Sequence, residues 1–167
     1  IALGNLTNAG GVGNVALGFN TEARLGVGAV AMGINTSSNG NAALAVGEQT
    51  QAVTKGSVTA GYLSTSLRGN YGMALGVGLR TNSFGGTVVG LYNEDSDAGN
   101  PTAIDNSNRI FQVGNGTSAA SGFRRNAMTI LQNGNVGIGV LNPDHNLVVR
   151  RDIRLDDMES NSGTMVG

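Results

Sequence analysis

The sequence contains one histidine, His145, and this side chain is the first candidate for acid–base chemistry or metal binding. Either role needs partner groups close by, and the adjacent Asp144 is the one obvious partner in the sequence. The chain has no cysteine, and no serine stands in a G-x-S-x-G segment, so no nucleophile is indicated. We therefore expect a structural role for His145 in an Asn-Pro-Asp-His turn. We expect the protein to be no enzyme and to hold no cofactor and no metal.

Aspartates offer a second kind of chemistry, because carboxylates are preferred ligands of Ca²⁺. Asp95, Asp97 and Asp105 fall in a polar, turn-rich segment, but their spacing lacks the glycine and the downstream glutamate of an EF-hand. We therefore favour a solvated loop for this segment. Asp156 and Asp157 are adjacent, so in an extended chain they point to opposite faces and suit a solvated edge better than a catalytic carboxylate pair.

Glycines and arginines raise two further possibilities. Residues 26–31, GVGAVA, match the loose dinucleotide fingerprint G-x-G-x-x-[GA], but no helical pattern follows them, so we reject this site. Arg150, Arg151 and Arg154 form a small basic cluster that fits contact with an acidic glycan or ion pairs between chains, and the acidic residues nearby favour the ion pairs. The formal net charge of −1 gives no indication of a nucleic-acid partner.

The sequence contains a short repeat, which defines the secondary-structure elements that would position any functional residue. Apolar triplets that end in glycine recur about every 14 residues, and polar residues such as Asn-Thr follow the glycine. An α-helix is excluded because each glycine would destabilise it by about 1 kcal/mol and because no period of 3.6 is present. The repeat therefore indicates short strands closed by turns. The glycines are Gly4, Gly18, Gly33, Gly47, Gly61, Gly76 and Gly90.

A period of about 14 residues fits one coil of a parallel β-solenoid, with two short strands and two turns in each coil. Coils stack at the interstrand distance of about 4.8 Å, so seven coils span roughly 30 Å. Asn20, Asn35 and Gln49 occupy equivalent turn positions, and we expect them and the threonines that follow them to form side-chain ladders. The sequence thus predicts an all-β fold.

Both faces of each long strand are apolar, which indicates burial on both sides. In VALG, Val15 and Leu17 point one way, and Ala16 and Gly18 point the other way. We expect the larger side chains to fill the coil and another chain to cover the small-residue face, because so thin a coil holds little core of its own. The residues expected in this packing are Ala2, Gly4, Ala16, Gly18, Ala31, Gly33, Ala45, Gly47, Gly61, Ala74, Gly76 and Gly90.

The composition changes near Gly90, which we interpret as a domain boundary. The first 90 residues hold 19 of the 28 glycines but only 6 of the 21 charged side chains. The dipeptide Asn133-Gly134 is typical of a tight hairpin turn. We therefore expect a repeat domain over 1–90, a polar loop over 91–108, a β-rich collar over 109–158 with strands at 109–116, a hairpin at 126–139, strands at 146–151 and 152–158, and a frayed tail over 159–167.

The motifs VALGFNT and VAMGINT at this spacing resemble the head repeat of trimeric autotransporter adhesins, the YadA-like head, over about residues 1–90. The resemblance implies a homotrimer of left-handed parallel β-rolls, displayed extracellularly on a surface fibre and used for attachment. Thr59 and Val88 depart from the family, which favours a small alanine-like residue there. Residue 1 falls within a repeat, so we expect any membrane anchor to lie outside these 167 residues.

Residues 109–150 carry a second resemblance. IFQVGNG followed by NAMTILQNGNVGIG is similar to a segment of bacterial surface fibres and phage tail fibres that often precedes an intramolecular chaperone. By this resemblance, the collar clamps three chains together. The expected partners are two further copies of the chain and a host-cell, matrix or glycan receptor. No apolar run approaches the length of a membrane-spanning helix, so we expect no membrane insertion of this segment.

Three functions stay open at this point. The first is adhesion or receptor binding at a cell surface. The second is a receptor-binding tail fibre of a phage or of a phage-like contractile injection system, and the third is a purely structural spacer. The pattern does not indicate the ligand or the residues that bind it. Tyr62, Tyr71 and Tyr92 are candidates because exposed aromatic rings suit contact with sugars.

Overall fold

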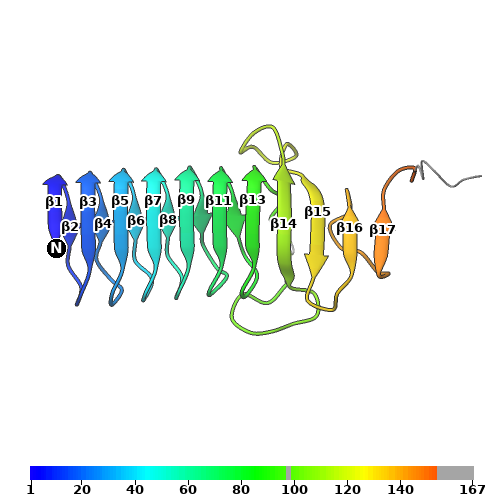
Figure 1. The fold of residues 1–167 in the computed structure, drawn as a ribbon, viewed down its shortest axis with the longest axis horizontal. Helices are drawn as coiled ribbons and strands as arrows, with labels where there is room; N and C mark the ends of the chain where they lie inside the picture. Colours follow the sequence, from blue (N-terminus) through cyan, green and yellow to red (C-terminus); the bar gives the residue numbers. More distant parts are fainter. Residues whose placement is uncertain (97–98, 154–167) are drawn as a thin grey trace, which may run out of the picture.

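The computed structural model describes residues 1–96 and 99–153, and every regular element in them is a β-strand. The strands follow one another along an elongated molecule (Figure 1). An 11-stranded sheet holds β1 (Ala2–Asn5), β3 (Val15–Phe19), β5 (Val30–Ile34), β7 (Leu44–Glu48), β9 (Val58–Tyr62), β11 (Met73–Val77), β13 (Thr87–Leu91), β14 (Arg109–Asn115), β15 (Asn126–Leu131), β16 (Val136–Ile138) and β17 (Leu147–Val149). A 6-stranded sheet holds β2 (Asn8–Ala9), β4 (Glu22–Ala23), β6 (Ser37–Ser38), β8 (Gln51–Ala52), β10 (Thr65–Ser66) and β12 (Arg80–Thr81).

Each coil of the repeat places one longer strand in the long sheet and one two-residue strand in the short sheet. Consecutive coils pair in parallel, and the register sets glycine over glycine, as in Gly18 with Gly33 and Gly33 with Gly47. The short sheet follows the same order, so that Ala9 pairs with Ala23. The expected parallel β-solenoid, built of coils that repeat with the glycine period, is therefore confirmed.

The repeated glycine is required by the close approach of neighbouring coils. Gly33 has a φ of +129°, and a Cβ built on it would lie 1.9 Å from the carbonyl oxygen of Gly47. Glycine adopts such a φ without steric cost, whereas residues with a Cβ do not. Gly4 and Gly18 repeat this geometry against the next glycine along the stack. The glycine period is thus a period of backbone contact between coils.

The turn that follows each glycine contains a residue in the left-handed region, with φ of 50° at Asn20 and 53° at Asn35. Asparagine tolerates this conformation better than most residues. Asn20 donates a side-chain N–H to Oδ1 of Asn35 at 2.8 Å, so the expected ladder is confirmed for this pair. The expected threonine ladder is wrong, because the buried hydroxyls of Thr21, Thr36 and Thr50 find no hydrogen-bond partner among the described residues.

Alanine lines the interior of the coils. Ala16 is 0% exposed in the single chain, whereas Val15 and Leu17 on the same strand are only partly buried. The expected assignment of the two faces is therefore wrong: the small side chains fill the coil and the larger ones point outward. The physical reason is that the short turns hold the two sheets close together. In these coils, only a side chain as small as a methyl group fits between them. Four of the alanines that we expected to pack against another chain are fully buried within the single chain and so cannot do so: Ala16, Ala31, Ala45 and Ala74.

The last coils hold larger buried residues. Thr59 and Val88, which depart from the adhesin repeat, occupy the inward position of their strands and are fully buried. Val88 packs with Ala74 and Leu79 in one apolar cluster. Leu79 stands at the turn position that a threonine takes in earlier coils, so the interior gains apolar volume at this end of the solenoid.

The long sheet is continuous through Gly90. After the loop, β14 pairs with β13 in parallel and sets Gly114 beside Gly90, as if it were one more coil. The chain then reverses: β15 pairs with β14 and β16 pairs with β15, both antiparallel. The expected hairpin is confirmed, and its turn residue Gly134 has a φ of +90°. β17 returns in parallel to β16 and lies inside the range 146–151 expected for a strand.

The interior of the collar is mostly polar, with Leu131 as a buried apolar side chain. Gln112 and Thr129 take the inward positions of β14 and β15 and are buried. Asn126 donates to Oε1 of Gln112 at 2.8 Å and to the Thr129 hydroxyl at 3.2 Å. Its own Oδ1 accepts the backbone N–H of Glu94 at 2.8 Å. These hydrogen bonds tie the loop after β13 to the collar strands.

Several expected strands and candidate residues lie partly or wholly outside the described residues. Asp152 and Ile153 belong to no strand, and the rest of the expected strand 152–158 lies outside the described residues. The same holds for the tail 159–167, and for Asp97, Arg154, Asp156 and Asp157. Residues 26–31 form a turn that runs into β5, so strand rather than helix follows the glycines there.

Candidate functional site

The outer face of the long sheet carries two columns of apolar side chains. Residues on either side of an inward residue in a strand point to the opposite side of the sheet, which here is outward. The columns hold mostly branched or long apolar side chains over the repeat. The first is Val15, Val30, Leu44, Val58, Met73 and Thr87, and the second is Leu3, Leu17, Met32, Val46, Ala60, Leu75 and Val89.

Both columns continue into the collar, where the glycine repeat has ended. The register of β14 sets Phe111 beside Thr87 and Val113 beside Val89. On the next three strands the two columns continue through Ile130, Val136 and Leu147, and through Met128, Ile138 and Val149. We call the two columns together the apolar face. It crosses all 11 strands of the long sheet, which at about 4.8 Å per strand makes it about 50 Å long.

The apolar face is open to solvent in the single chain. Five of its side chains are exposed, among them Met32 at 38%, Leu75 at 37% and Ile138 at 40%, and the others are half-buried. A contiguous apolar strip along a whole sheet is therefore a candidate interaction surface. Its shape, a straight strip along a rod, suits another rod-like surface better than a compact ligand.

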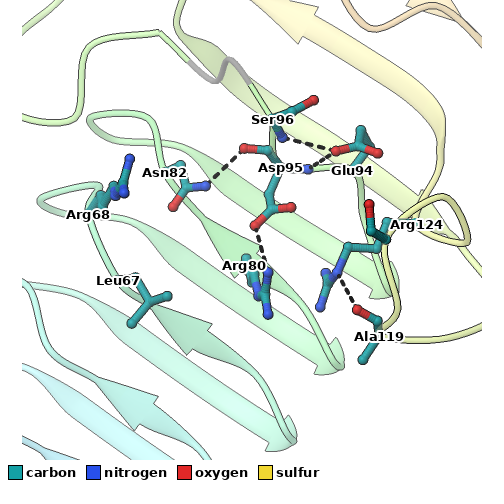
Figure 2. A pocket seen from close by; sticks show the side chains of 10 residues that line it. Leu67, Arg68, Arg80, Asn82, Glu94, Asp95, Ser96, Ala119 and Arg124 are labelled. Atoms are coloured by element: carbon teal, nitrogen blue, oxygen red, sulfur yellow. Dashed lines mark hydrogen bonds and ion pairs between the residues drawn. The ribbon is translucent and has the colours of Figure 1, made fainter.

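A second feature is a groove of about 410 Å³ at the junction of the solenoid and the collar. Its walls come from the last turns of the solenoid, from the residues after β13 and from the loop between β14 and β15 (Figure 2). We call it the arginine groove. It is lined by Leu67, Arg68, Arg80, Asn82, Glu94, Asp95, Ser96, Ala119, Ser121 and Arg124.

The floor of the arginine groove is held by polar contacts between successive coils. Nη1 of Arg80 lies 3.3 Å from Oδ2 of Asp95, fifteen positions along the chain. Asn82 donates its side-chain N–H to the carbonyl of Asp95 at 2.9 Å. The backbone N–H of Arg80 donates to Oδ1 of Asn93 at 2.8 Å. These residues are therefore fixed in position by the stack.

Arg124 enters the arginine groove from the loop between β14 and β15 and is only 7% exposed. Its Nη1 donates to the carbonyls of Gly78 at 2.9 Å and Asn93 at 3.1 Å, and its Nε donates to the carbonyl of Ala119 at 3.3 Å. Burial, and then the positive charge of Arg80, lower the pKa of the Arg124 guanidinium. Among the described residues, this arginine binds the loop to the last coils through backbone carbonyls alone.

Glu94 forms the upper wall of the arginine groove. Its Oε1 accepts the backbone N–H groups of Asp95 and Ser96, both at 3.0 Å. Burial opposes ionisation of this carboxyl, but the hydrogen bonds from Ser96 and Asp95 and the charge of Arg109 outweigh burial and lower its pKa. Glu94 is therefore a charged residue whose carboxylate is engaged with its own turn.

The structure does not bring the three candidate tyrosines together. Tyr62 ends β9 and Tyr92 follows β13, so both lie at the carboxyl ends of these parallel strands, two coils apart. Tyr71 lies in the turn before β11, at the amino ends of the strands. There its ring meets Phe84 edge-on at 5.5 Å, and Nζ of Lys55 lies 5.7 Å from the ring centroid. Each tyrosine is a local surface feature rather than part of one site.

The remaining candidates stay isolated. Nδ1 of His145 lies 2.9 Å from Oδ1 of Asp144, and both side chains are exposed. Oδ1 of Asp105 accepts the backbone N–H of Ser107 at 2.8 Å within its own turn, whereas Asp95 is paired with Arg80. No three His, Asp or Glu side chains of the described residues are placed to hold a metal ion.

No helix long and apolar enough to cross a membrane occurs in residues 1–96 and 99–153.

Comparison of the chain with protein-family models, with curated proteins and with solved structures found no match. The candidate sites are therefore judged by their geometry. One is an apolar strip on one side of a rod, about 50 Å long for 11 strands at about 4.8 Å each, and the other is a mixed-charge groove at the junction of the solenoid and the collar.

Proposed function

We propose that this chain is a non-enzymatic segment of a homotrimeric surface fibre that acts in adhesion or receptor binding. The observation that supports the proposal is the apolar face. A strip of valine, leucine, methionine and isoleucine along a rod is stabilised when another copy of the same strip covers it. The contact surface proposed here is therefore the larger outward side chains, in place of the alanine and glycine face expected from the sequence.

Two features favour three chains around an axis parallel to the rod. Parallel packing keeps the coils of all copies at the same level, so apolar columns of equal length meet along their whole extent. Each chain offers two columns, so one column can pack against the preceding copy and the other against the following copy. Such a heterologous contact closes into a ring when the rotation allows it. The resemblance to trimeric adhesin heads supports the number three.

Attachment follows from the assembly. A trimer presents three copies of every outward turn and of the arginine groove in fixed relation. Weak contacts made together gain a factor of about 10²–10⁴ over a single contact when the geometry permits joint engagement. A fibre that holds its binding surfaces at a fixed distance from an anchor is suited to this task.

The mass of the 167-residue chain in solution tests the assembly, because the chain alone has 16.9 kDa. Light scattering should give three times that mass. Introducing Met32→Glu and Leu75→Glu together places charges in the proposed contact and should yield a folded monomer. The control Val53→Glu changes a side chain that is 41% exposed but lies off the apolar face, and should leave the trimer intact. A folded wild-type monomer or dimer would refute the trimer.

The adhesive role needs a separate readout. The trimer and the double variant are compared for retention on immobilised host-cell, matrix and glycan surfaces. We expect the trimer to be retained and the monomeric variant to wash off, because single contacts are weak. A stable trimer that is retained on none of these surfaces would contradict adhesion and favour a structural spacer.

A further inference from the structure

We propose that the arginine groove binds a sugar that carries a carboxylate, such as a uronic or a sialic acid, with Arg68 and Arg124 on either side of the anionic group. This inference rests on the proposed function, because it names the class of receptor that the fibre would contact. Figure 2 shows Arg68 on one side of the groove and Arg124 on the other, with Arg80 between them.

Two of the three arginines in the groove have no ion-pair partner among the described residues. Of the three arginines, Arg80 alone has an ion pair among the described residues, with Asp95. Arg68 is exposed and makes no polar side-chain contact within residues 1–96 and 99–153. Arg124 is nearly buried, yet no carboxylate of the described residues lies within ion-pair distance of its guanidinium. The groove thus holds two cations whose charge is available to an anion.

Arg124 is nearly buried, and backbone carbonyls are its only hydrogen-bond partners among the described residues. A buried cation without an ion-pair partner is costly unless hydrogen bonds or a bound anion compensate it. Three backbone carbonyls accept from Nε and Nη1, whereas no described residue accepts from Nη2. The charges of Asp95 and Glu94 favour the charged form from a longer distance. An anionic ligand at Nη2 would complete this set, with a charge-assisted hydrogen bond.

The other walls of the groove are mostly polar. Asp95 and Glu94 carry negative charge into the same groove, which disfavours a multiply charged anion such as phosphate. Asp95, Asn82 and Ser121 offer hydrogen-bond acceptors and donors of the kind that sugar hydroxyls need. Leu67 is the one large apolar side chain in the lining, so an apolar peptide anchor has little to pack against. A singly charged, hydroxyl-rich ligand fits this lining best.

The test is a calorimetric titration of the 167-residue chain with sialyllactose and with a glucuronate-containing hyaluronan tetrasaccharide. Lactose is the neutral control, and sodium phosphate and a short polyglutamate peptide represent other anions. Arg68→Gln removes one groove cation at an exposed position, so the fold should not change. Arg24→Gln is the matched control, because it removes the same charge from an exposed arginine that lies far from the groove along the solenoid. Arg24 forms an ion pair with the nearby Glu22.

We expect one or both acidic sugars to bind, lactose not to bind, and Arg68→Gln to weaken binding about tenfold or more, as the loss of a charge-assisted contact does. Arg24→Gln should stay within about twofold of wild type, since it removes only an exposed ion pair and no contact to the sugar. Absence of binding by both acidic sugars, equal weakening by the two variants, or tighter binding of phosphate or polyglutamate would each overturn the proposal.

The outcomes separate this inference from the proposed function. If the acidic sugars do not bind while the chain is a trimer that is retained on host-cell or matrix surfaces, the groove assignment alone fails. If the chain is a monomer, the trimeric fibre fails, and the titration still reports on the groove of the single chain.

Discussion

The stacking of glycine on glycine can be tested by adding one methyl group at Gly33. The substitution Gly33→Ala places a Cβ 1.9 Å from the carbonyl oxygen of Gly47, at a residue whose φ is +129°. Gly28 lies shortly before it in the same coil, has a φ of +66° and has no atom within 4 Å of a built Cβ. Gly28→Ala is therefore the matched control: the same change on the same coil without the collision.

The expected magnitudes follow from these two geometries. At Gly28 the cost is that of one alanine in the left-handed region, about 1 kcal/mol. At Gly33 the backbone strain is about 1–3 kcal/mol, because the conformation is essentially restricted to glycine. Relief of the 1.9 Å contact must also separate β5 from β7 and stretch flanking hydrogen bonds, such as the 2.9 Å bond from the N–H of Gln49 to the carbonyl of Ile34. Losing two such bonds adds about 2 kcal/mol.

Equilibrium unfolding in urea, followed by circular dichroism, measures both variants against wild type. We expect Gly33→Ala to lose about 4 kcal/mol and Gly28→Ala about 1 kcal/mol. Because each coil contacts its neighbours only, the lesion at Gly33 can also split the transition into two steps. Equal losses in the two variants, or a loss below about 1 kcal/mol at Gly33, would refute the argument that backbone contact between coils selects the repeated glycine.

Two further predictions concern the interior and the loop after β13. Ala45→Leu should destabilise the fold by about 1–3 kcal/mol through overpacking, whereas Val53→Leu at an exposed position should change stability by less than about 0.5 kcal/mol in the same urea assay. The lowered pKa of Glu94 means that its stabilising contribution is present above its unfolded pKa and is lost as pH falls through its folded pKa. The melting temperature of Glu94→Gln should therefore fall less between pH 7 and pH 3 than that of wild type. The same fall in both proteins would contradict this.

The solenoid could be predicted from the sequence because its cause is local. The evenly spaced glycines mark the backbone contact directly, and Asn133-Gly134 marks the hairpin turn. The direction of the faces could not be predicted by the same means. Alternation in VALG shows that Ala16 and Leu17 point to opposite sides, but which side is inside depends on the distance between the two sheets. That distance is a tertiary quantity, and over most coils it admits only a side chain as small as alanine.

The arginine groove could not be predicted from the sequence for a related reason. Arg124 reaches the carbonyl of Gly78, 46 positions earlier, and no periodic pattern predicts that contact. Part of the groove did carry a signal. Arg80 and Asp95 are 15 positions apart, which is one coil of the repeat, so opposite charges at that spacing indicate an ion pair between neighbouring coils. A search for charged residues at the coil period would have found the floor of the groove but not its Arg124 wall.

The collar gives the strongest reason to regard the apolar face as an assembly surface. In the solenoid, outward apolar residues could follow simply from copying one repeat. After β14 the repeat is gone, the strand direction reverses, and each strand has a sequence of its own. The same two columns nevertheless continue through Val113, Met128 and Ile138 and their neighbours. A second chain lying along the whole rod, as in the proposed trimer, would account for this continuity.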